Sequence, residues 1–142
     1  MVTTPTPDAT QPPVRPTIFC IDDDPLVLNF YEDFLAAHGY EVVTATDGLV
    51  GIQLAADLRP DVILLDVMLR GLSGYDICRK ARADPALRGI PIILLTVWDD
   101  PSVATTGRDA GATLTLQKPA DPETILTAVA GVLGRQSGPP GR

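Results

Sequence analysis

The sequence has few of the residues that cysteine-based sites or basic binding surfaces require. Its 142 residues include only two cysteines, Cys20 and Cys78, too few and too far apart for a disulfide framework or a cysteine metal site. Eleven lysines and arginines stand against 18 aspartates and glutamates, which gives a net charge of −7. Because nucleic acids and anionic membranes attract basic surfaces, this balance argues against both as partners.

Long hydrophobic runs and a targeting segment are missing as well. The longest apolar runs, residues 62–69 and 90–98, are too short and too interrupted to span a bilayer. The first residues, MVTTPTPD, have neither a basic start nor an apolar stretch, so we expect no secretory signal. With so little cysteine, the sequence predicts a reduced, cytoplasmic protein.

What is present has the composition of one folded domain with a short extension at each end. Hydrophobic residues make up 45% and charged residues 20%, as in globular proteins, and the length suits a single domain. Residues 1–15 are rich in proline and threonine without apolar periodicity, which predicts a disordered arm. We expect the domain to cover residues 16–134 and a disordered tail to cover residues 135–142.

Short apolar runs alternate with segments of helical spacing between these ends. The predicted strands are residues 17–21, 40–44, 62–65, 91–95 and 112–116. The predicted helices are residues 25–38, 48–58, one that starts at Ser73, a poor one at 101–110 and one from Asp121 to Gly134. Five strand-then-helix units indicate parallel strands joined by right-handed crossovers, a three-layer α/β fold.

The helix at 101–110 is the weakest of the five by its sequence. Its interior contains Thr105, Thr106 and Gly107, which together cost roughly 2 kcal/mol of helix propensity relative to alanine. We therefore expect it to be the softest element of the domain.

Charged and hydroxyl side chains follow the predicted strands, where ligands bind in sheets of this kind. Residues 22–24 are three aspartates after the first strand, Asp66 follows the third, Thr96 the fourth and Lys118 the fifth. An isolated acidic run is usually a solvated loop, but a carboxylate at the end of the most apolar strand costs several kcal/mol unless it is compensated. A hard divalent cation such as Mg²⁺ would compensate it and would bridge carboxylates to a phosphoryl group.

Four segments resemble, in order and spacing, the receiver domain of two-component response regulators. They are FCIDDDPLVLNFYEDFLAAHGYEVVTATDG, PDVILLDVMLRGLSGYDICRKAR, PIILLTV and LQKPA. The resemblance covers about residues 16–134. It implies a doubly wound, flavodoxin-like sheet of five parallel strands in the order 2-1-3-4-5, with helices on both faces.

The resemblance also implies a phosphorylation site and a metal site. Asp66 would be the phosphoacceptor, which takes its phosphoryl group from a histidine kinase or a phosphotransfer protein as a mixed anhydride. Asp23, Asp66 and the backbone carbonyl of Met68 would hold Mg²⁺. Asp22 would act mainly through a coordinated water.

The remaining implied roles belong to residues of the last two strands. Thr96 would move its hydroxyl onto the phosphoryl group, and Lys118 would clamp that group as a point charge. Pro119 would follow a cis peptide bond that fixes the direction of the lysine.

Some positions depart from the family pattern. Thr115 stands where the family usually has an aromatic residue that swings inward on activation, and Val97 replaces a small alanine. Arg70 replaces a common proline, and Ala120 replaces a common phenylalanine. None of these changes removes a group that the chemistry requires. Trp98, next to the predicted site, is either a packing residue or a shield for the phosphoryl group.

The expected function is a non-enzymatic phosphorylation switch that binds a downstream protein, since the tail after Gly134 is too short for a DNA-binding module. An alternative is a degenerate receiver that binds proteins without phosphorylation. A phosphatase with an aspartyl nucleophile would need a general acid where Met68 stands. A flavodoxin-like cofactor binder would need a Ser/Thr/Gly-rich loop where three carboxylates stand. His38, the only histidine, suits a structural role at a helix end better than phosphorelay.

Overall fold

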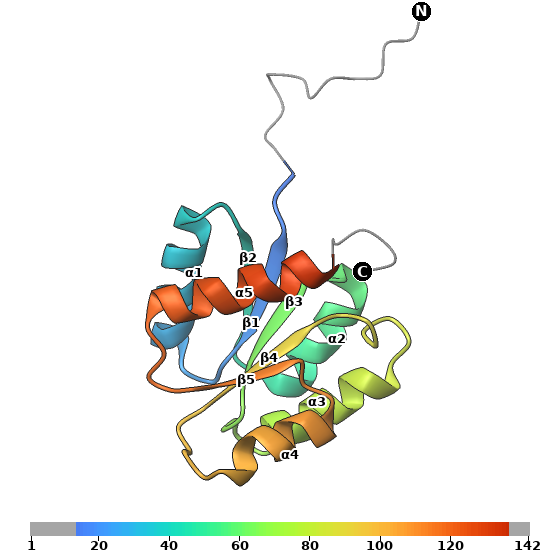
Figure 1. Ribbon diagram of the computed structural model, residues 1–142. Helices are drawn as coiled ribbons and strands as arrows, with labels where there is room; N and C mark the ends of the chain where they lie inside the picture. Colours follow the sequence, from blue (N-terminus) through green and yellow to red (C-terminus); the bar gives the residue numbers. More distant parts are fainter. Residues whose placement is uncertain (1–13, 137–142) are drawn as a thin grey trace, which may run out of the picture.

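Strand and helix alternate throughout residues 14–136, the part of the chain that the computed structural model describes (Figure 1). The strands are β1 (Thr17–Ile21), β2 (Glu41–Ala45), β3 (Val62–Asp66), β4 (Ile92–Thr96) and β5 (Leu114–Gln117). The helices are α1 (Pro25–Ala37), α2 (Gly48–Leu58), α3 (Gly74–Ala83), α4 (Ser102–Ala110) and α5 (Pro122–Gln136). No helix in this range is long and apolar enough to cross a membrane.

All five strands are parallel and lie in one sheet in the order β2-β1-β3-β4-β5. The predicted fold class and strand order are therefore confirmed. Every residue of the central strands β3 and β4 is buried, as expected for strands that are covered on both faces. The order places β3 between β1 and β4, so the carboxyl ends of these three strands are neighbours.

Helices cover both faces of the sheet and form two separate cores (Figure 1). On one face, α1 and α5 pack over side chains such as Ile18, Leu64 and Ile93. On the other face, α2, α3 and α4 pack over side chains such as Phe19, Ile63 and Leu94. Cys20 and Cys78 are both fully buried in these cores, and burial raises the pKa of each thiol. Both cysteines are packing residues.

Several elements extend beyond the predicted bounds. As expected, β3 ends at Asp66 and β4 at Thr96, one residue beyond the apolar runs 62–65 and 91–95, because Asp66 is paired with Leu95 and Thr96 with Gln117 in the sheet. Helix α5 continues past Gly134 to Gln136, since no residue before that point turns the backbone. The predicted arm, apart from its last two residues, and the tail from residue 137 on lie outside the described residues.

An arginine ties the connections at the opposite end of the sheet from the acidic residues. The Arg82 guanidinium donates to the carbonyls of Leu87, Arg88 and Ile90 at 2.8–3.2 Å and to the carbonyl of Gly111 at 2.7 Å. Burial lowers the pKa of Arg82. Five N–H groups in a planar fork can satisfy several carbonyls at once, so this one side chain joins the α3–β4 connection to the end of α4.

Helix α3 begins in direct contact with the end of β3. The Gly74 amide donates to the carbonyl of Val67 at 2.7 Å. A Cβ at Gly74 would collide with the Asp66 carbonyl oxygen and would lie 2.7 Å from the Val67 Cα. Only glycine allows the helix to approach the Asp66 loop this closely.

We therefore expect Gly74→Ala to destabilise the domain by about 1–3 kcal/mol, the usual cost of overpacking. The matched control is Gly131→Ala in α5, where a Cβ meets nothing within 4 Å and should stabilise the helix by about 0.5–1 kcal/mol. Urea unfolding of the two variants measures both free energies. Equal effects of the two substitutions would contradict the packing argument.

Candidate functional site

Three carboxylates meet at the carboxyl end of the sheet. Asp22 follows β1, Asp23 comes next, and Asp66 ends β3. One carboxylate oxygen from each of the three lies within 4.8 Å of the other two. Asp22 is 2% and Asp66 7% exposed. They come together because β1 and β3 are hydrogen-bonded neighbours, with Ile21 opposite Leu65. The chain therefore concentrates negative charge where water is largely excluded.

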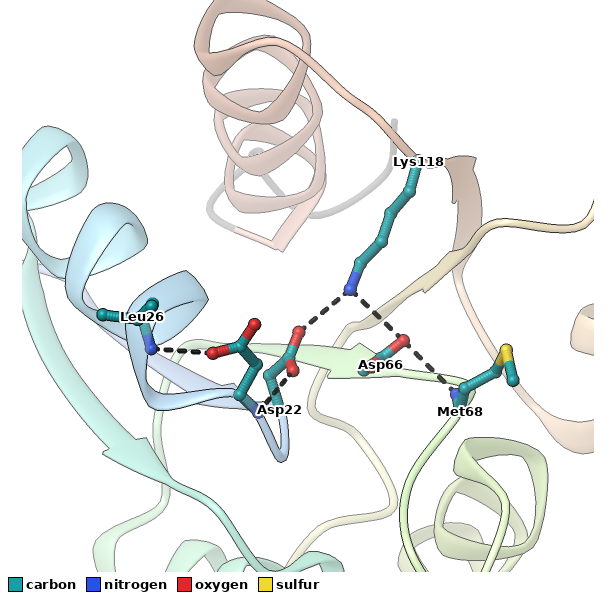
Figure 2. A network of polar contacts seen from close by, with 6 residues as sticks. Asp22, Leu26, Asp66, Met68 and Lys118 are labelled. Atoms are coloured by element: carbon teal, nitrogen blue, oxygen red, sulfur yellow. Dashed lines mark hydrogen bonds and ion pairs between the residues drawn. The ribbon is translucent and has the colours of Figure 1, made fainter.

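Lys118 brings a positive charge into this acidic group (Figure 2). Its Nζ lies 2.9 Å from Asp22 Oδ2 and 3.4 Å from Asp66 Oδ1. Its amide donates to the Thr96 carbonyl at 2.6 Å, and the following Lys118–Pro119 bond is cis. The backbone of β4 thus positions the residue from which the side chain reaches the carboxylates.

Burial and neighbouring charges raise the pKa values of both Asp66 and Lys118. Burial and the neighbouring Asp22 charge raise the pKa of Asp66, against the lowering effect of Lys118 and of the Met68 amide. Burial by itself lowers the pKa of Lys118, but the hydrogen bond to Asp22 and the two carboxylate charges outweigh it and raise that pKa. The two carboxylates therefore favour the charged form of Lys118, and any further positive charge near Asp66 would favour its charged form.

The aspartates of the acidic run have different tasks. Asp24 Oδ1 accepts from the Leu26 amide at 2.9 Å and caps α1, so its carboxylate is not part of the group of three. The Asp24 amide in turn donates to Asp22 Oδ1 at 3.0 Å. Asp23 lies 3.8 Å from the guanidinium of Arg70, whose side chain is 92% exposed. Only Asp22 and Asp23 are thus available for the site.

Met68 and Thr96, which lie next to the acidic group, each take part in a hydrogen bond that involves a backbone amide. The Met68 amide donates to Asp66 Oδ1 at 3.3 Å, while its side chain is half exposed. Thr96 is fully buried, and its hydroxyl oxygen accepts from the Trp98 amide at 3.1 Å. An open cavity of about 500 Å³ adjoins Met68 and is also lined by Asp23, Arg70 and Trp98, among others.

Three of these features were missed by sequence reasoning. Asp24 before Pro25 matches the pattern of a helix cap followed by proline, which was available as a signal. The double contact of Lys118 with Asp22 and Asp66, and the bond between Thr96 and the Trp98 amide, had no sequence signal, because both depend on how separate strands end relative to one another.

The donor set fits a hard divalent cation. All three carboxylates offer oxygen ligands, and Mg²⁺ prefers oxygen donors in a site that retains several waters. One face of the group adjoins the open cavity, which leaves room for such waters. A carboxylate such as that of Asp66 also has the chemistry to form an acyl phosphate, and it lies 3.4 Å from the Lys118 ammonium group.

Comparisons with known proteins point to one family. The family model of the response regulator receiver domain matches residues 18–130. RpaA, a DNA-binding dual master transcriptional regulator from Synechocystis, is 38% identical over 120 residues, which are 84% of this chain and 50% of RpaA. Protein PilH from Pseudomonas aeruginosa is 34% identical over 116 residues, 82% of this chain and 96% of PilH.

A solved structure agrees with these relatives. The receiver domain of the sensor histidine kinase PA1611 from Pseudomonas aeruginosa, with a magnesium ion coordinated in its active-site cleft, is 29% identical with a TM-score of 0.78. The match covers 85% of this chain and 99% of that one. This chain spans about half the length of RpaA and nearly all of PilH. With the family model matched over 18–130, the chain belongs to the response regulator receiver domains of two-component signalling.

Proposed function

We propose that this receiver domain is a phosphorylation switch, with Asp66 as phosphoacceptor, a histidine kinase or phosphotransfer protein as donor, and a downstream protein as target. The observation that carries the proposal is the place of Asp66. It ends the central strand β3, is 7% exposed, and lies 3.4 Å from the Lys118 ammonium and within 4.8 Å of two further carboxylates. Family membership supports the same assignment.

In the chemical step, a phosphoryl group passes from the imidazole of the donor to the Asp66 carboxylate. An oxygen of the Asp66 carboxylate attacks phosphorus as the bond from phosphorus to the donor nitrogen breaks, and the electron pair of that bond stays on the imidazole. The product is a mixed anhydride on Asp66. The carboxylate must be ionised to attack. Lys118, held 2.9 Å from Asp22, keeps a positive charge beside the developing phosphoryl oxygens, and the Thr96 hydroxyl donates to one of them.

A divalent cation fits the same residues. Asp23, Asp66 and the Met68 carbonyl would hold Mg²⁺, with Asp22 acting through a coordinated water. When bound, the metal would neutralise charge on the transferring group. The chain's own contribution is to hold the carboxylates together at the ends of β1 and β3. The magnesium in the related PA1611 receiver domain supports this reading.

The outer face of α1 offers a docking surface for the donor. Leu26 in its first turn is 75% exposed and Phe30, one turn on, 50%. The Leu26 amide is bonded to Asp24 Oδ1, and Leu26 lies at the end of α1 that faces Asp22 (Figure 2). Exposed apolar side chains beside a reactive group favour contact with a protein rather than with a small ligand.

The net charge of −7 favours a protein target over DNA, although RpaA, of which the chain spans half, is a DNA-binding regulator. Met68 in the place of a general acid supports a signal carrier rather than a phosphatase.

The second candidate is a receiver that signals without phosphorylation, which Thr115 in β5 favours because it lacks the usual aromatic ring.

The first test is labelling with a small acyl-phosphate donor and Mg²⁺, followed by intact mass measurement. We expect one added phosphoryl group on the wild type and none on Asp66→Asn, which keeps the shape but loses the nucleophile. The control, Asp57→Asn on the exposed side of α2, should label like the wild type. Full labelling of Asp66→Asn would place the site elsewhere, and an unlabelled wild type would favour the second candidate.

Mg²⁺ should raise the melting temperature even without phosphate, because it relieves the repulsion of three close carboxylates. Binding to the folded state alone adds about 1.4 kcal/mol of stability at tenfold excess over Kd. Asp23→Ala should abolish this rise, and Asp57→Ala should leave it intact. Thermal unfolding in EDTA and in excess Mg²⁺ measures the difference. Identical curves for the wild type would exclude a functional metal site.

The raised pKa of Asp66 predicts a pH dependence of stability in EDTA. The folded state holds this proton more tightly than the unfolded chain, so the wild type loses stability as the pH rises from the ordinary value of 3.8 through the raised pKa. Asp66→Asn has no such loss and should be about 1 kcal/mol more stable than the wild type at pH 7. The difference should shrink at pH values below the Asp66 pKa. An Asp66→Asn variant less stable at neutral pH would refute the argument.

A further inference from the structure

A second open cavity lies between the start of α3 and the start of α4, outside the acidic site. Its volume is about 560 Å³, within the range of small-ligand sites. Its walls come from α3, from the connection after β4 and from α4, and they include Tyr75, Trp98 and Val103. Of its lining residues, only Trp98 also lines the cavity beside the acidic site. The two cavities are therefore distinct, and the proposed function of Asp66 makes no use of this one.

Tyr75 brings to this cavity a hydroxyl that has no partner within the protein. The residue is 9% exposed, and its hydroxyl makes no hydrogen bond to any other described residue. Across the described part of the chain, no fully buried side-chain oxygen lacks a partner. The Tyr75 hydroxyl therefore reaches solvent, and it does so at the cavity that the residue lines. Because a buried phenol usually has a hydrogen-bond partner, this hydroxyl favours a ligand that bonds to it in the cavity.

Asp99 and Asp100 give the same cavity a negative charge. Both line it and both are exposed. Among the described residues neither forms an ion pair, and none of the residues that line the cavity is basic. Asp100 Oδ1 accepts from the Ser102 amide at 2.8 Å, and this hydrogen bond lowers the pKa of Asp100. Asp100 thus holds the first turn of α4, whereas the Asp99 carboxylate has no such task.

The remaining wall is apolar and includes an aromatic ring. Trp98 is 47% exposed, and its indole contacts no aromatic ring and no cation within the described residues. Val97 and Val103 lie along the same cavity. The face of an indole attracts cations through the quadrupole of the ring. The cavity therefore combines negative charge, an aromatic ring and a hydroxyl acceptor, a set of groups that suits an organic cation.

We propose that this cavity binds a guanidinium group, carried by an arginine of a partner protein or by a free guanidinium compound. A guanidinium is planar, so it stacks on an indole while its N–H groups donate in the plane to carboxylates and to the Tyr75 hydroxyl. An ammonium is more strongly hydrated and lacks the flat face. A hard metal ion takes oxygen ligands only and gains nothing from the apolar wall. The inference does not rest on the proposed function of Asp66.

The test is an NMR titration of the full chain, labelled with ¹⁵N, with the peptide acetyl-Gly-Arg-Gly-amide. We expect a Kd on the order of 1 mM, with amide shifts centred on Tyr75 and residues 97–106. The same peptide with citrulline in place of arginine has nearly the same shape and no charge, and it should bind about tenfold more weakly. The lysine peptide should also bind more weakly than the arginine peptide. A titration with n-butylguanidinium compares a free compound with the peptide.

Two variants test the residues that form the site. Tyr75→Phe keeps the ring and breaks no hydrogen bond among the described residues, so it should unfold like the wild type and bind the arginine peptide about fivefold more weakly. Its control, Tyr40→Phe, lies against the core on the other face of the sheet. Asp99→Asn should weaken binding about tenfold. Its control, Asp109→Asn, removes the same charge from an exposed position of α4 that does not line the cavity. Both controls should bind like the wild type.

The outcomes decide both the site and the source of the cation. Absence of saturable shifts with the arginine peptide, or equal binding of the citrulline peptide, would overturn the proposal. Unchanged binding in both Tyr75→Phe and Asp99→Asn would place the peptide elsewhere and would overturn it too. A lysine peptide that binds as tightly as the arginine peptide would overturn the choice of guanidinium. Tighter binding of the arginine peptide than of n-butylguanidinium would support an arginine of a partner protein, and the reverse or equal order would support a free guanidinium compound.

Discussion

The structure depends on the balance between two buried carboxylates and one lysine. Asp22 and Asp66 are almost inaccessible to water at the ends of apolar strands, where an uncompensated charge costs several kcal/mol. Lys118 contacts both and offsets part of that cost. Lys118 is the one buried positive charge against three carboxylates, since Arg70 beside Asp23 is exposed to solvent, and the site is left short of positive charge. This shortage favours the binding of a cation, and of a phosphoryl group that binds together with a cation.

The rest of the fold serves to keep these charges at fixed positions. The sheet order places β1 beside β3 and β3 beside β4, so aspartates separated by more than forty residues meet at one edge. Gly74 lets α3 press on the Asp66 loop, and Asp24 caps α1 instead of adding a fourth charge. Packing on both faces makes β3 and β4 rigid, so the site cannot relax its repulsion by spreading apart.

The same rigidity confines change to the elements that are loosely packed. β3 and β4 are buried throughout, whereas α4 buries two residues. The hydroxyl of the buried Thr96 accepts from the amide of Trp98, which lies in the connection between β4 and α4. On the β5 side, Gly107 of α4 approaches Thr115 so closely that an added Cβ would collide with the Thr115 hydroxyl oxygen.

The sequence by itself determined the alternation of strands and helices, because uninterrupted apolar runs such as residues 62–65 suit only strands covered on both faces. Chain order and spacing, with the resemblance to receiver domains, led to Asp22, Asp23, Asp66, Thr96 and Lys118. Only the tertiary structure decided what these residues contact. Lys118 bridges two carboxylates, Asp24 turns away to cap a helix, and Thr96 bonds to the Trp98 amide. Such contacts depend on strand register and loop direction, which are set by packing between segments far apart in the chain and leave no local pattern in the sequence.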